Sequence, residues 1–181
     1  KTAVISVILR KAMLLPKGDY QVWENFSLTL PEDLTFGPGI HYLSGANGSG
    51  KSSMITKLLL PRLLKTSSTY SVYLEQQMQV QLTAVKAYAS VVQPRRTIDT
   101  ESETIDFLLD NLLCAWQKEP RPCYVVMDES LFAMRVLDFL QANLPSFSLI
   151  YSAHTQLFKA DQTILFEAIS PTRNEVYVSR P

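Results

Sequence analysis

Apolar positions along the chain follow two patterns. Runs rich in Val, Ile, Leu and aromatic residues predict strands, at 2–15, 20–30, 39–44, 71–74, 123–127, 147–151, 162–166 and 175–178. Apolar residues at helical spacing predict helices, at 54–60, 80–92, 100–116 and 131–144. Strands that alternate with helices favour an α/β fold whose crossover connections are right-handed.

Breaker residues separate these elements and set their boundaries. The turn signal at 16–19 predicts that segments 2–15 and 20–30 form an antiparallel hairpin, and 31–38 is expected to be a loop. Pro61 is expected to stop or kink the helix that contains it. A Thr and a Glu at the start of the 100–116 helix have the spacing of a capping box.

Composition and charge narrow the class of protein. With 181 residues, of which 46% are hydrophobic, the chain is expected to form a single domain, 1–181, with a substantial core. The 17 basic and 17 acidic side chains cancel, so no general footprint for nucleic acid is present. Cys114 and Cys123 have neither metal-site nor disulfide-scaffold spacing, which favours a reducing compartment. The apolar runs are too short for a membrane-spanning segment.

The strongest motif is the segment 45–53, which reads GANGSGKSS and matches the phosphate-binding loop pattern G-x-x-x-x-G-K-[ST]. It lies between a predicted strand and a predicted helix, so its N–H groups and the helix N-terminus would face an anion. Lys51 would reach the β and γ phosphates, and Ser52 would ligate Mg²⁺. The residues expected to bind the nucleotide here are Asn47, Gly48, Ser49, Gly50, Lys51, Ser52 and Ser53.

A pair of carboxylates follows the most apolar strand, 123–127. Such a continuous run suits a strand buried on both faces of a parallel sheet. Asp128, at its end, is the candidate Mg²⁺ ligand, and Glu129 is the candidate base that polarises the water attacking the γ phosphate. Ligands of open α/β sheets bind at this carboxyl edge of the strands.

Two further polar residues follow predicted strands and are expected at the same edge. His154 comes after the strand at 147–151, where an imidazole could hydrogen-bond the γ phosphate or orient the attacking water. Gln76 comes after the strand at 71–74, where its amide could reach Mg²⁺ or that water. On physical grounds Gln77 is an equal choice for this role.

The order of these motifs resembles the ATP-binding cassette (ABC) ATPase superfamily over nearly the whole chain. The resemblance implies a P-loop NTPase fold of ABC type, with a mostly parallel central sheet and an N-terminal antiparallel β subdomain. The motif intervals are compact, so the helical subdomain, roughly 77–121, is expected to be reduced. In the family an aromatic side chain of the N-terminal hairpin stacks on adenine. Tyr20 is the first candidate and Trp23 the second, although either could be ordinary hairpin packing.

The resemblance also implies ATP hydrolysis with Mg²⁺, by two such domains that sandwich two ATP molecules. Catalysis would fall to Glu129, His154 and Gln76, and metal binding to Ser52, Gln76 and Asp128.

The family's Leu-Ser-Gly-Gly-Gln signature is missing. In its place are residues 99–104, where Ser102 is the candidate to stand in for the signature serine. Three acidic residues surround it and would repel an incoming γ phosphate. We therefore expect low activity for the chain alone, and a hetero-dimer with a second ABC-type ATPase subunit rather than a homo-dimer.

Three functions fit the resemblance. The leading one is the ATP-hydrolysing subunit of an ABC-type transporter that energises separate integral membrane subunits. It predicts a cytoplasmic protein associated with the cytoplasmic face of a membrane, with no nucleic acid partner. The alternatives are a soluble ABC-type ATPase acting on DNA or a macromolecular complex, and a regulatory nucleotide-binding subunit of low activity.

Overall fold

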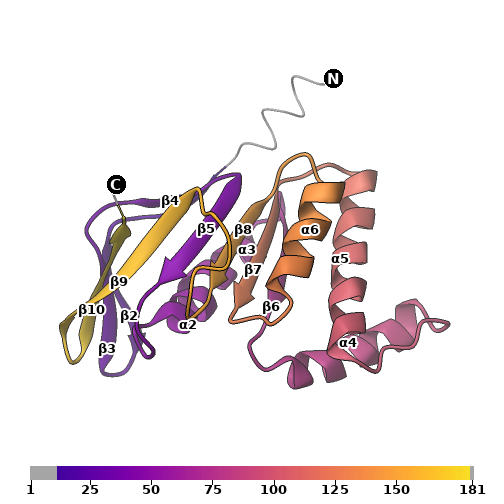
Figure 1. The fold of residues 1–181 in the computed structure, drawn as a ribbon, viewed down its shortest axis with the longest axis horizontal. Helices are drawn as coiled ribbons and strands as arrows, with labels where there is room; N and C mark the ends of the chain where they lie inside the picture. The colour runs from indigo at the N-terminus through magenta and orange to yellow at the C-terminus, as the bar shows by residue number, and fades with distance from the viewer. Residues whose placement is uncertain (1–11, 180–181) are drawn as a thin grey trace.

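The fold is built on one large sheet, seen in a computed structural model that describes residues 12–179 (Figure 1). In spatial order the eight strands are β2 (Gly18–Trp23), β3 (Phe26–Leu30), β10 (Arg173–Val178), β9 (Gln162–Ser170), β5 (Gly39–Ser44), β8 (Ser148–Ser152), β7 (Cys123–Asp128) and β6 (Tyr70–Leu74). A separate two-stranded sheet pairs β1 (Met13–Leu15) with β4 (Leu34–Phe36).

Parallel pairing dominates the part of the sheet that carries the sequence motifs. The strands from β9 through β5, β8 and β7 to β6 all pair in parallel, whereas β2 with β3 and β9 with β10 pair antiparallel. The predicted α/β fold with a mostly parallel sheet is therefore confirmed. Parallel pairing also places the carboxyl ends of β5, β8, β7 and β6 at one edge.

Four helical regions accompany this sheet. A continuous helix follows β5 and consists of α2 (Lys51–Ser53), the π-helical segment η1 (Met54–Leu59) and α3 (Leu60–Lys65). Pro61 does not stop it, because this proline lies in the first turn of α3, where its missing N–H is tolerated. The other helices are α4 (Met78–Val92), α5 (Glu101–Lys118) and α6 (Ala133–Asn143).

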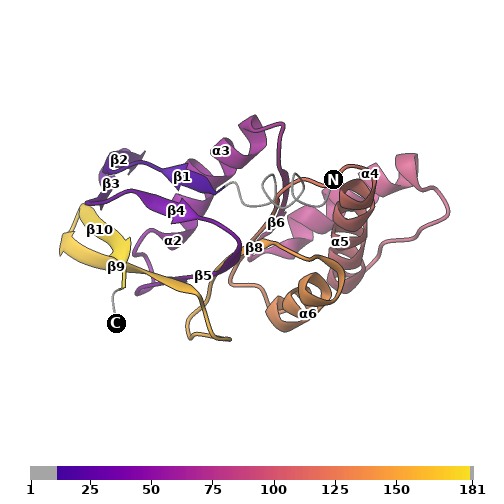
Figure 2. The same ribbon diagram turned by 90° about the horizontal axis from the view of Figure 1, so that it is seen from above.

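The helix after β5 covers one face of the sheet, and α5 and α6 cover the opposite face (Figure 2). Side chains of β7 alternate between two cores, so that Val126 packs with the helix after β5 and Val125 packs with α5 and α6. All six residues of β7 are buried, as predicted for a strand covered on both faces. The capping box of α5 is confirmed, since the Thr100 hydroxyl accepts from the Glu103 N–H while the Glu103 carboxylate accepts from the Thr100 N–H.

The predicted hairpin at the start of the chain is wrong in its pairing. β2 and β3 form the hairpin instead, with the turn at Glu24 and Asn25, and β1 pairs with β4. Residues 31–38, expected to be a loop, contain β4 because Leu34 and Phe36 alternate with an exposed residue and are both fully buried. The part of the prediction that covers 2–11 lies outside the described residues.

The segment 77–121, expected to form a reduced helical subdomain, consists of α4, α5 and the loop between them. The two helices share a small core of Val85, Ala89, Ile98 and Phe107. α5 also packs on the main sheet, whereas α4 lies at the end of the molecule beside α5 (Figure 1).

Candidate nucleotide site

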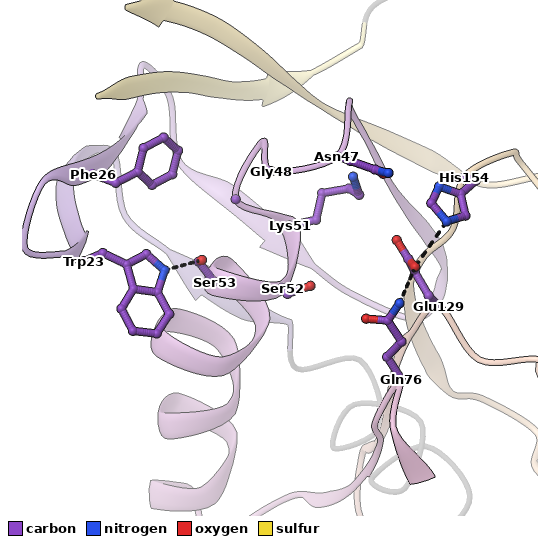
Figure 3. A pocket seen from close by; sticks show the side chains of 11 residues that line it. Trp23, Phe26, Asn47, Gly48, Lys51, Ser52, Ser53, Gln76, Glu129 and His154 are labelled. Carbon is purple, nitrogen blue, oxygen red and sulfur yellow. Dashed lines mark hydrogen bonds and ion pairs between the residues drawn. The ribbon is translucent and has the colours of Figure 1, made fainter. Parts of the chain in front are cut away.

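The predicted motifs meet in one pocket at the carboxyl edge of the parallel strands. It has a volume of about 530 Å³ and opens between the loop after β5 and the ends of β6, β7 and β8 (Figure 3). The residues that line it are Trp23, Phe26, Asn47, Gly48, Gly50, Lys51, Ser52, Ser53, Gln76, Glu129 and His154.

The loop after β5 depends on two glycines with positive φ. Gly48 has φ 75° and Gly50 has φ 98°, both in the region that side chains disfavour. At Gly50 a Cβ would also lie 2.9 Å from Cδ2 of Leu28 and 3.0 Å from Cε1 of Phe26. At Gly48 a Cβ would meet nothing within 4 Å. The loop therefore approaches β3 more closely than any residue with a side chain could.

Gly50→Ala is expected to destabilise the chain by more than Gly48→Ala. Both pay about 1–2 kcal/mol for a left-handed backbone, and Gly50→Ala adds about 1–3 kcal/mol because Leu28 and Phe26 must shift. Urea denaturation of the two variants measures the difference in unfolding free energy. Equal stability of the two variants would contradict the packing of this loop against β3.

Lys51 forms the floor of the pocket. Its side chain is buried, and Nζ donates hydrogen bonds to the carbonyl oxygens of Gly45, at 2.7 Å, and Ala46, at 2.9 Å. Burial lowers the pKa of Lys51, while the nearby Glu129 and Asp128 carboxylates act in the opposite direction. An ammonium held at the base of a glycine loop is suited to bind an anion that enters the pocket.

Asp128 lies beneath the pocket rather than on its lining. It is buried at the end of β7, and its Oδ1 accepts a hydrogen bond of 2.6 Å from the Ser152 hydroxyl. The parallel register pairs Asp128 directly with Ser152 at the end of β8. Sequence reasoning missed Ser152, although a hydroxyl at the end of the neighbouring buried strand was a signal for it.

Gln76, Glu129 and His154 converge in the pocket from the ends of three strands (Figure 3). The Gln76 Nε2 donates to Glu129 Oε2 at 2.7 Å, and His154 Nε2 lies 3.3 Å from the same oxygen. Glu129 has a φ of 50°, the one positive value outside glycine among the described residues, and its N–H donates to the Ser152 carbonyl. This turn aims the carboxylate into the pocket rather than along β7.

Of the two glutamines after β6, Gln76 enters the pocket and Gln77 does not. Gln77 is the N-cap residue of α4. The Gln76 amide oxygen points away from Glu129, to the side of the pocket where the Ser52 hydroxyl lies (Figure 3). Of the two glutamines, Gln76 is therefore the one positioned to reach a ligand in the pocket. The sequence alone left this choice open.

The oxygen donors at this edge fit a hard divalent cation. Ser52, Gln76 and Asp128 offer a hydroxyl, an amide and a carboxylate oxygen, which are the donor types that Mg²⁺ takes, with water and phosphate completing its coordination. Among residues 12–179 no group of three His, Cys, Asp or Glu side chains is arranged to hold a metal.

Of the two candidate aromatic platforms, Trp23 lines the pocket and Tyr20 does not. Trp23 is 54% exposed, its Nε1 donates to the Ser53 hydroxyl at 2.7 Å, and Lys57 Nζ lies 4.5 Å from the ring centroid. The hydroxyl of Tyr20 instead donates to the Pro16 carbonyl, and Tyr20 is absent from the pocket lining. The structure thus favours the second candidate for the aromatic platform.

Three other residues support or line the site in ways that were not all predicted. Phe26 lines the pocket, and the Asn174 side chain of β10 donates to the Ser49 carbonyl at 2.8 Å, fixing the loop from below. Ser49, a predicted ligand, is buried, and its Oγ has no hydrogen-bond partner in the described part of the chain. Phe26 and Asn174 carry no sequence signal, since their roles come from strand pairing.

No model of a known protein family matches this chain, and no curated protein matches it in sequence. Across residues 12–179, no helix combines the length and apolar character needed to cross a bilayer. What the pocket binds must be inferred from its own residues.

Proposed function

We propose that the chain is a P-loop NTPase of ABC type that binds ATP with Mg²⁺ and hydrolyses it. The observation that carries this proposal is that one pocket brings Lys51 and the glycine loop together with Gln76, Glu129 and His154. A phosphate loop, an amide, a carboxylate and an imidazole that converge from four strand ends supply the parts that phosphoryl transfer needs.

Binding would centre on the loop after β5. The triphosphate would lie over the N–H groups of the loop and the N-terminus of the helix that begins at Lys51. Nζ of Lys51 would exchange its bonds to the Gly45 and Ala46 carbonyls for phosphate oxygens. When bound, Mg²⁺ would neutralise part of the phosphate charge, held by Ser52, Gln76 and, through water, Asp128.

Hydrolysis would centre on Glu129. Its carboxylate accepts the proton of a water as that water oxygen bonds to the γ phosphorus, while the bond from phosphorus to the β–γ bridging oxygen breaks. Gln76 holds this carboxylate in place through the 2.7 Å hydrogen bond. His154, whose Nε2 lies 3.3 Å from the same oxygen, would donate to the γ phosphate.

Residues 99–104, which take the place of the signature motif and would face a partner's ATP, support a hetero-dimer. Arg135 donates hydrogen bonds to the Ser102 hydroxyl and to both oxygens of Asp106. Ser102, the candidate stand-in for the signature serine, is therefore engaged within its own chain. We propose that a second ABC-type ATPase subunit supplies the competent signature.

We also propose that the pair energises integral membrane transporter subunits at the cytoplasmic face of a membrane. Support comes from the resemblance of the motifs and from a net charge of zero, which gives no general attraction to nucleic acid. Co-purification of the chain with an integral membrane subunit is the expected result. Salt-sensitive DNA binding without such a subunit would contradict the transporter role.

Trp23 gives a direct optical test of nucleotide binding. ATP added to the Trp116→Phe variant, in which Trp23 is the remaining tryptophan, is expected to quench its fluorescence as adenine stacks on the indole. Trp23→Ala should weaken ATP binding by about 1–3 kcal/mol, roughly 5-fold to 150-fold, whereas Tyr20→Phe should leave it unchanged. A greater loss in Tyr20→Phe than in Trp23→Ala would refute the assignment.

A further inference from the structure

α4 has an apolar face that points away from the rest of the molecule. With about 3.6 residues per turn, Met78, Val85 and Ala89 lie on one side of the helix. Val85 and Ala89 are buried with Phe107 of α5, and Met78 is buried in the core that contains Ile105 and Leu109 of α5. A second apolar face, here called the outer stripe, is exposed and consists of Val80, Ala84, Ala87 and Val91. Tyr88 flanks it, with its ring edge-on to Phe107 of α5 at 6.2 Å between ring centroids.

The exposure of the outer stripe is large. Val80 is 70% exposed and Val91 79%, and the two alanines between them are also exposed. The polar side chains of α4 gather on the strip beside it, which includes Lys86 and Ser90. A helix that is apolar on two faces is typical of one that packs on two partners.

The outer stripe is symmetric along the helix. Val80 and Val91 lie equally far along the chain from the point between Val85 and Lys86, and Ala84 and Ala87 are related in the same way. If two copies of α4 pair antiparallel about a two-fold axis, each Val80 faces a Val91 and each Ala84 faces an Ala87. The central alanines allow the two helices to approach closely, and the outer valines close the ends of the contact.

Charges agree with the same arrangement. Within α4 the one charged side chain is Lys86, which lies off the outer stripe and is paired with Asp99, so two copies do not repel each other. Beyond the helix ends, Glu75 precedes α4 and the exposed Arg95 follows it. Antiparallel pairing brings the Arg95 end of one copy to the Glu75 end of the other.

We propose that the outer stripe of α4 is a docking surface for a second copy of this chain, which binds through an antiparallel α4 to α4 contact. This surface is separate from the nucleotide pocket and does not depend on the proposed function. A contact along one helix of 15 residues buries less than the roughly 800 Å² per partner of a standard interface. The dimer is therefore expected to be weak, with a dissociation constant in the micromolar range or above.

Charge variants of the two valines test this contact. In sedimentation velocity without nucleotide, the wild-type chain is expected to dimerise as its concentration rises, and Val80→Glu or Val91→Lys should each weaken the dimer by about tenfold or more. The double variant Val80→Glu/Val91→Lys should restore it, because each Glu then faces a Lys, and added salt should weaken the restored dimer. In a parallel pairing the double variant would instead place like charges opposite each other.

Two controls separate this contact from others. Ser90→Glu adds a charge to the neighbouring exposed strip and should leave dimerisation unchanged. Lys51→Ala, which removes the proposed phosphate contact, should also leave it unchanged, so the outcome is independent of ATP binding. A monomer at the highest concentrations, association that needs ATP, or a double variant weaker than both single variants would each overturn the proposal. Circular dichroism of the single variants should match the wild type, since both valines are largely exposed.

Discussion

Lys51→Ala is expected to weaken ATP binding by about 100-fold, the loss that follows when charged hydrogen bonds worth about 3 kcal/mol are removed. The buried ammonium is the one cation on the pocket lining apart from any charge on His154. Without it, the triphosphate would lose the ammonium at the base of the loop and keep only the loop N–H groups, the helix N-terminus, His154 and bound Mg²⁺. Calorimetric titration of both proteins with ATP and Mg²⁺ measures the difference.

Two further variants make the Lys51 result interpretable. Lys65→Ala removes a lysine at the other end of the same helical run and should leave ATP affinity unchanged. Lys51→Met keeps most of the side-chain volume, so it should lose ATP binding like Lys51→Ala while disturbing packing less. Unimpaired ATP binding by a folded Lys51→Met variant would show that the pocket does not hold phosphate at this residue.

Glu129→Gln is expected to reduce the rate of ATP hydrolysis by about 100-fold to 10,000-fold, the range that a general base contributes. The amide keeps the size of the side chain but cannot accept the proton of the attacking water. ATP binding should persist, because the proposed role of Glu129 is to accept a proton from the water rather than to bind the phosphate chain. Phosphate release and nucleotide retention, measured on the same preparation, separate the two effects.

The matched control is Glu119→Gln, which makes the same chemical change at the end of α5. Glu119 pairs with Arg121 and is absent from the pocket lining, so hydrolysis should be unaffected. An equal rate in Glu129→Gln and the wild type would remove Glu129 from the role of base. Equal losses in both variants would point to general instability.

Local sequence patterns predicted the elements that depend on local chemistry. The β5 strand occupies residues 39–44 as expected, and the capping box of α5 forms as the Thr and Glu spacing indicated. Each relies on neighbours in sequence, whose periodicity and hydrogen-bonding partners are visible before folding. The same holds for β7, whose continuous apolar run matches its burial on both faces.

Features set by distant pairing were not predictable. The pairing of β1 with β4 depends on which strand of the N-terminal region meets which, and the 31–38 segment looked like a loop because prolines flank it. Within the site, Phe26, Ser152 and Asn174 reach the phosphate loop or Asp128 only through the order of strands in the sheet. No spacing rule relates such residues.

Which face of α4 is buried was also not predictable from the sequence. The sequence 80–92 is apolar around much of the helix, so periodicity identifies a helix without deciding which side is buried. Contact with α5 buries Val85 and Ala89, and leaves Val80 and Val91 outside. Only the packed structure separates the core face from the outer stripe.

The central claim is that the pocket formed by the loop after β5 and the ends of β6, β7 and β8 binds ATP. Calorimetric titration of the purified wild-type chain with ATP and Mg²⁺ tests it most directly. The account predicts saturable binding of one ATP per chain, lost in Lys51→Met. The absence of saturable binding by the folded wild-type chain, or binding that Lys51→Met leaves intact, would contradict it.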